Sequence, residues 1–155
     1  MDDKKISELS APTTLTGAEM FPIAQGGETV AALISQVMPL FQMTASETIA
    51  AGNFVNIHAN SGAKVRKANA TDATKPVNGW APAGIASAAS GTIQGPGTLI
   101  TGLSGLTPGV PYYLSTTGGG LIATPPSSSG NLVQHVGVAL SATALFFYPQ
   151  QGTEL

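Results

Sequence analysis

Short apolar runs alternate with turn-forming residues along most of the chain after Met43. Segments such as NSG, GPG, LTPG, TTGGG and TPPSSSG separate these runs. Short strands at intervals of about 8–12 residues with such turns are typical of small barrels and sandwiches. The pattern therefore predicts a mostly β domain over residues 44–155, folded as a small antiparallel β-barrel or sandwich. The expected strands are Phe54–Ala59, Ala63–Ala68, Gly79–Ala86, Gly91–Gln94, Leu99–Leu103, Pro111–Ser115, Leu121–Ala123, Leu132–Leu140 and Ala144–Tyr148.

Residues 1–43 have a different pattern and form a separate N-terminal segment. Within it, the stretch EMFPIAQGGETVAAL contains two short apolar runs on either side of Gly26 and Gly27. A two-residue type I′ turn needs positive φ at both central residues, which glycine adopts without steric cost. This stretch therefore predicts a β-hairpin closed by the two glycines.

The next stretch, LISQVMPLF, predicts a short helical turn. Ser35 is a residue type that caps helices, and Val37, Met38 and Phe41 follow at helical spacing. Pro39 limits this helix to about one turn, because proline disrupts a helix interior. A hairpin and one turn are too small to be stable alone. We therefore expect residues 1–43 to be an anchoring arm that orders on a larger surface.

Charge also divides the chain in two, but at a different place, after Lys75. Charged residues make up 9% of the sequence, against roughly 25% in an average soluble domain. Residues 76–153 contain no Asp, Glu, Lys or Arg. The net charge of −2 provides no basic field, so we expect no nucleic-acid partner. The uncharged half also raises the question of what covers its surface.

Other features of the sequence indicate where in the cell the chain is made. The chain has no cysteine, so it forms neither disulfides nor thiolate metal sites. The start, MDDKKISELS, is polar and does not resemble a signal peptide. No apolar run reaches the roughly 18 residues that span a membrane. We expect a chain made in the cytoplasm, with no membrane partner.

Reactive side chains are few, which predicts a protein that is not an enzyme and needs no cofactor. His58 and His135 lie in separate expected strands with no acidic ligand near either in sequence, so we expect no metal site. No G-x-S-x-G nucleophile motif occurs. The lysines and the arginine of KVRK, residues 64–67, are typical of a solvated strand face; a docking surface for an acidic partner is the alternative.

Aromatic residues gather in two expected strands of the uncharged half. They could form a binding strip for sugars, but strand alternation favours a second interpretation. In it, alternate residues face a core and a boundary between subunits. Trp80 is expected to be a core anchor. The residues of the expected subunit interface are Tyr112, Tyr113, Phe146, Phe147 and Tyr148.

Two stretches resemble bacteriophage proteins. ISELSAPTTLTGAEMFPIAQGGETVAAL is similar to a motif at the start of many tailed-phage fibre and head-decoration proteins. The matching residues are Ile6, Leu9, Leu15, Gly17, Glu19, Pro22, Ile23, Gln25 and Gly27. The stretch GLTPGVPYYLSTTGGGLIATPPSSSGNLVQHVGVALSATALFFYP resembles a small β domain of phage virion proteins. Together the two stretches, residues 6–33 and 105–149, cover a little under half of the chain.

The resemblance implies a homotrimer whose N-terminal part docks on the virion while the β domain projects from it. The implied function is non-enzymatic decoration of the capsid as a trimeric knob or short head fibre, bound to the major capsid or another shell protein. The implied location is the virion, assembled in the cytoplasm of the bacterial host. The apolar residues expected to dock on the shell are Phe21, Ile23, Val30, Leu33, Val37, Leu40 and Phe41.

Two other functions remain open at this point. The chain could be a tail-fibre or receptor-binding module whose aromatic residues and loop tips contact glycans on the host cell. A small hydrolase is the third candidate, and it requires a reactive constellation that the sequence does not contain. The short length favours decoration, because a tail fibre usually adds a long shaft.

Overall fold

The computed structural model describes residues 20–25, 28–33, 40–59 and 61–155, and all regular elements within these ranges are strands. The chain divides into two compact units, Met1–Met38 and Pro39–Leu155. The expected boundary after Met43 therefore falls inside a strand, Leu40–Ala45, that belongs to the second unit. Each unit is described by itself.

The first unit contains the hairpin expected around the glycine pair. Strand β1 (Met20–Gln25) pairs antiparallel with β2 (Glu28–Leu33). Gln25 is the Cα partner of Glu28, so the hairpin lies where the sequence predicted it, while Gly26 and Gly27 themselves lie outside the described residues. The expected helical turn lies largely at residues 34–39, outside the described residues. Phe41, placed in that turn by the sequence pattern, instead belongs to a strand.

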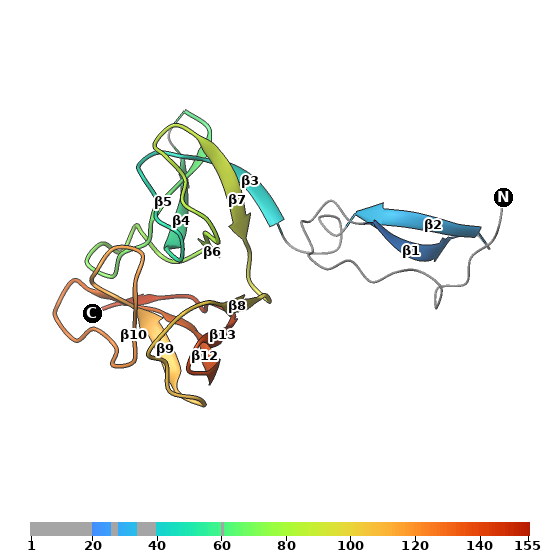
Figure 1. The fold of residues 1–155 in the computed structure, drawn as a ribbon. Helices are drawn as coiled ribbons and strands as arrows, with labels where there is room; N and C mark the ends of the chain where they lie inside the picture. Colours follow the sequence, from blue (N-terminus) through green and yellow to red (C-terminus); the bar gives the residue numbers. More distant parts are fainter. Residues whose placement is uncertain (1–19, 26–27, 34–39, 60) are drawn as a thin grey trace. The chain divides into compact units, whose positions relative to one another are not determined.

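The second unit begins with a closed five-stranded barrel, which confirms the expectation of a β-barrel (Figure 1). The order around the barrel is β3-β5-β4-β6-β7, and β3 pairs with β7 to close it. The pairing of β3 with β5 is parallel, so the barrel is not purely antiparallel as expected. The strands are β3 (Leu40–Ala45), β4 (Phe54–Ala59), β5 (Ala63–Lys67), β6 (Gly79–Trp80) and β7 (Ser90–Gln94).

Small and branched side chains fill the barrel interior. Val55, Val65 and Ile93 are almost fully buried there, on three different strands. Gly79 on β6 lies close to the Ile93 side chain of β7, because a Cβ added at Gly79 would be 2.5 Å from that side chain. Successive side chains of a strand point to opposite sides, so Val55 joins the cluster inside the barrel while its neighbour Phe54 joins the cluster shared with the sheet.

A five-stranded antiparallel sheet follows the barrel. Its order is β10-β9-β12-β13-β8, with irregularities in β12 after His135 and after Ala139. A two-residue pair, β11 with β14, ties down the C-terminal residues. The strands are β8 (Leu99–Thr101), β9 (Pro111–Leu114), β10 (Leu121–Ile122), β11 (Leu132–Val133), β12 (His135–Ser141), β13 (Ala144–Phe147) and β14 (Thr153–Glu154).

One face of this sheet packs on the outside of the barrel, as Figure 1 shows for strands β8–β13 and β4–β6. The rings of Phe54 on β4 and Phe147 on β13 lie 5.7 Å apart at 58°, an ordinary geometry for aromatic pairs. Trp80 is buried in the same cluster and donates its indole N–H to the carbonyl of Gly52. Trp80 is therefore the core anchor that the sequence predicted. Barrel and sheet residues share this cluster, which is separate from the cluster inside the barrel.

Candidate interaction surface

The outer face of the five-stranded sheet is apolar. An antiparallel sheet with one face on a core usually presents polar residues on the other face. Here Leu99 on β8 and Phe146 on β13 are 54% and 43% exposed and are Cα partners. Val138 lies opposite Phe146, and Ile122 lies opposite Tyr113. We call these five residues, together with Pro111, His135, Leu140 and Tyr148, the outer face.

Aromatic side chains form a row within the outer face. The Tyr113 and His135 rings are 5.8 Å apart and perpendicular, at 87°. The His135 and Tyr148 rings are 5.0 Å apart, and the Tyr148 and Phe146 rings 5.2 Å apart. The strand pairings β9–β12 and β12–β13 bring these rings together from distant parts of the sequence. We call these four residues the aromatic row.

His135 is the titratable group whose environment is most unusual in this row. Its Nδ1 atom is buried and has no hydrogen-bond partner within the described part of the chain. Burial lowers the pKa of His135 below its ordinary value, because desolvation disfavours the charged imidazolium. The ring is therefore held neutral by its surroundings, with one nitrogen enclosed.

The structure divides the expected subunit-interface residues between two faces. Tyr113, Phe146 and Tyr148 lie on the outer face, as alternation predicts. Tyr112 and Phe147 are 7% and 0% exposed within a single chain, so placing them at a subunit interface is wrong. They point toward the barrel because successive side chains of a strand point to opposite faces. The Tyr112 hydroxyl accepts a hydrogen bond from the Thr107 N–H at 3.0 Å.

The expected docking residues fall on both units. Phe21 and Ile23 are in β1, and Val30 and Leu33 are in β2, where Ile23 and Val30 are Cα partners. Val37 lies outside the described residues. The remaining two, Leu40 and Phe41, are in β3 of the barrel rather than in the arm, because β3 pairs with β7. Phe41 is 49% exposed there.

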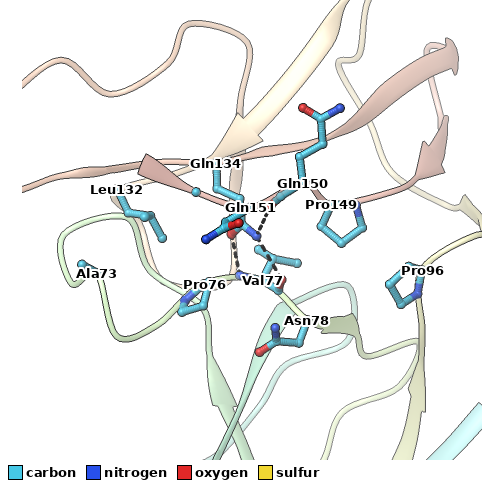
Figure 2. A pocket seen from close by; sticks show the side chains of 11 residues that line it. Ala73, Pro76, Val77, Asn78, Pro96, Leu132, Gln134, Pro149, Gln150 and Gln151 are labelled. Carbon is cyan, nitrogen blue, oxygen red and sulfur yellow. Dashed lines mark hydrogen bonds between the residues drawn. The ribbon is translucent and has the colours of Figure 1, made fainter. Parts of the chain in front are cut away.

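A second candidate site is an uncharged pocket of about 490 Å³ beside the barrel. Figure 2 shows its wall around Gln134, a buried side chain whose amide points at the backbone of Val77. Gln134 accepts from the Val77 N–H at 2.7 Å and donates to the carbonyls of Val77 and Gln150 at 3.2 and 2.9 Å. The amide is therefore occupied in linking segments of the fold. Exposed lining residues include Pro96, Gln150 and Gln151.

The two histidines lie in different modules, His58 on β4 and His135 on β12. Within the described ranges, no three His, Asp or Glu side chains gather as a metal site would require. His58 Nε2 is 2.9 Å from the Ser46 hydroxyl, which donates to the carbonyl of Val65. When the hydroxyl proton is donated to that carbonyl, the tautomer of His58 that carries a proton on Nε2 donates to Ser46.

Two of the three cationic side chains of KVRK, those of Arg66 and Lys67, make contacts with nearby residues of the second unit. Arg66 donates to Asn56 Oδ1 at 2.9 Å and to the carbonyl of Thr74 at 2.8 Å. Lys67 lies 3.8 Å from a Glu47 carboxylate oxygen. Asp72 is a charged group in a neighbouring loop, and hydrogen bonds from Thr74 lower its pKa to about 2. These contacts favour a solvated barrel wall over an acidic-partner site.

Sequence reasoning missed three exposed apolar residues of the outer face, Leu99, Ile122 and Leu140, and the position of His135 among aromatic rings. A signal was available in the stretch ALFF, residues 144–147, which is apolar at both its odd and its even positions. A strand that is apolar on both faces is expected to be covered on both faces.

Comparison with protein families, curated proteins and solved structures finds no match to this chain. Over the described residues, the structure has no helix long and apolar enough to cross a membrane. Two features bear on function: the geometry of the outer face and the resemblance of the two sequence stretches.

Proposed function

We propose that this chain is a non-enzymatic structural protein of a bacteriophage virion. In this proposal it decorates the capsid as a trimeric knob or short head fibre after assembly in the bacterial cytoplasm. Its partners are two further copies of itself and the major capsid protein or another shell protein. No cofactor, nucleic acid or membrane takes part.

The observation that carries the proposal is the uncharged, apolar outer face. Exposed apolar patches of this kind mark interaction sites, and the centres of protein interfaces are depleted of charge and enriched in aromatic residues. Phe146 and Leu99 are about half exposed in the single chain although they are paired side by side. Contact between copies supplies the cover that the sheet lacks, and it explains how residues 76–153 remain free of charge.

The N-terminal unit is the anchor in this proposal. A two-stranded hairpin is marginal in water without a surface to pack on. Hairpin β1–β2 carries four of the expected docking residues, and the barrel begins at β3 with the next two. The arm therefore orders on the shell, and the barrel and the sheet project from it.

Light scattering on the full chain tests the assembly. A trimer, three times the chain mass of 15.5 kDa, is expected at micromolar concentration. Electron microscopy of particles then tests attachment, with deletion of residues 1–38 as the comparison. The cut keeps β3 intact, and the described core clusters lie wholly within residues 39–155. The truncated protein should still trimerise but no longer attach; a 15.5 kDa monomer, or attachment by the truncated protein, would contradict the proposal.

A receptor-binding module is the second candidate, and the uncharged pocket favours it. Its lining combines prolines with the exposed amides of Gln150 and Gln151, groups that suit a neutral sugar better than an ion. A glycan array with the full chain separates the two functions. Specific binding that is lost in Gln151→Ala would support the receptor module, and an array without binding would remove it.

A further inference from the structure

One ionisable group lies in the middle of the uncharged surface. Within residues 76–153, His135 is the one side chain of a type that changes charge between pH 5 and 8. It is also the centre of the aromatic row, between Tyr113 and Tyr148. A surface otherwise independent of pH therefore contains a single proton-binding site.

We propose that the outer face of one copy packs against a second copy, and that protonation of His135 weakens this contact. The inference rests on the self-association in the proposed function and adds its surface and its regulation. The partner is another copy of this chain, and the contact closes when His135 is neutral.

Charge and shape both favour a second copy as the occupant. The outer face lies wholly in the uncharged part of the sequence, so it has no charge with which to select an acidic or basic partner. On β8 and β13 it has a bulky end and a small end. Leu99 and Phe146 lie at one end, while Thr101 and Ala144 are paired two residues further along the same strands. Leu140 on β12, which is 59% exposed, adjoins the small end. Bulky residues of one copy can pack beside Leu140 against the small end of the next, as in a closed ring of identical subunits.

The surroundings of His135 disfavour its charged form. The titratable groups that face the ring are the phenols of Tyr113 on β9 and Tyr148 after β13, and neither ion pair among the described residues involves it. A charged imidazole carries protons on both nitrogens, so Nδ1 would become a buried donor without an acceptor. Attraction of the cation to the tyrosine ring faces offsets part of this cost. A second copy over the row removes the remaining water and raises the cost again.

The direction of the pH effect follows from how enclosed His135 is in each state. Burial within the single chain already lowers the pKa of His135 below its ordinary value, and a second copy over the ring lowers this pKa further by removing the remaining water. The dissociated chain therefore takes up a proton at a higher pH than the associated one, so association is complete above the pKa of the single chain and weakens as the pH falls through it. At about pH 5.5 the expected loss in association constant, for each His135 that becomes enclosed, is less than the roughly tenfold that a histidine with an unshifted pKa of about 6.5 would give.

Sedimentation equilibrium of the full chain at about pH 7.5 and about pH 5.5 tests the inference. The protein concentrations should span the range over which the complex dissociates into single chains. We expect wild type to associate several-fold more weakly at the lower pH. His135→Gln, and independently His135→Phe, which keeps an aromatic ring in the row, should associate equally at both. His58→Gln is the matched control on the barrel and should keep the wild-type pH dependence. Fluorescence of Trp80, buried in the core, reports whether the fold is intact at each pH.

The outcomes separate the two proposals. Association that is equal at both pH values in wild type, or pH dependence that persists in both His135 variants, overturns the role of His135 and leaves self-association standing. A change in Trp80 fluorescence that accompanies dissociation also overturns it, because the loss is then unfolding. A wild-type chain that is monomeric at about pH 7.5 overturns the self-association itself.

Discussion

At the scale of single residues, Gly137 shows how closely β12 and β13 approach. A Cβ at this position would collide with the backbone carbonyl of Phe146 and would crowd the Leu145 side chain. Gly137 lies next to the irregularity that follows His135 and is itself buried. The glycine is needed for space rather than for its φ, because its φ is not positive. It permits the approach of strands that gives the aromatic row its spacing.

Gly137→Ala should therefore lower the free energy of unfolding by about 3 kcal/mol, because a backbone carbonyl cannot move aside as a flexible side chain can. Urea denaturation followed by Trp80 fluorescence measures this. Gly97→Ala is the control, since Gly97 has φ +87° but open space around its Cβ, and it should cost only about 1 kcal/mol. Equal costs for the two variants would show that the approach of β12 and β13 is not tight.

At the scale of elements, Gln134 joins three segments that are distant in sequence. It stands between β11 and β12 and binds Val77, which precedes β6, and Gln150, which follows β13. The barrel side and the C-terminal segment are thus linked by one buried amide. The link matters because Val77 itself lies in the core shared by the barrel and the sheet.

Gln134→Leu should lower the free energy of unfolding by roughly 3 kcal/mol, because it leaves one backbone N–H and two carbonyls of this network without their partner. Thermal and urea unfolding measure the loss. Gln151→Leu is the matched change, as Gln151 lines the same pocket but is exposed. It should change stability by no more than about 0.5 kcal/mol. If both variants unfold alike, the network does not hold the modules together.

At the scale of the whole molecule, two exposed phenylalanines separate attachment from assembly. Phe41 lies on β3 of the barrel and Phe146 on the outer face, and their side chains are 49% and 43% exposed. In the proposed function, Phe41 contacts the shell and Phe146 contacts a second copy. The two residues therefore provide matched substitutions of the same side chain.

Phe146→Ser should weaken self-association by at least about tenfold, because an aromatic anchor at the centre of an interface is removed. Phe41→Ser should leave the mass in solution unchanged and reduce the fraction bound to particles. Light scattering and co-sedimentation with particles measure the two effects. The assignment of the surfaces fails if Phe41→Ser dissociates the assembly or if Phe146→Ser has no effect on it.

Much of the second unit could be predicted from sequence. The expected strand Phe54–Ala59 is β4, and most of the other expected strands contain a shorter observed one. Strand β7 begins one residue before the expected Gly91–Gln94, and the expected Leu132–Leu140 is divided into β11 and β12. The expected strand Gly79–Ala86 is reduced to Gly79 and Trp80, because the chain turns at Pro82 and afterwards makes only the bridge between Ile85 and Ile49. Strand β3 was missed because its partners, β5 and β7, come later in the chain, and their pairing overrides the local pattern.

The order of apolar runs and turn residues was enough to locate most strands from β4 onward, and the absence of charged residues from 76 to 153 is visible in the sequence. The sequence did not show which residue of each aromatic pair faces the core. Tyr112 and Tyr113, like Phe146 and Phe147, are adjacent aromatic residues on opposite sides of a strand. Packing against Phe54 of the barrel buries Phe147 and leaves Phe146 outside. When both faces of a strand are apolar, alternation no longer distinguishes inside from outside, and the long-range contacts of the fold make that choice.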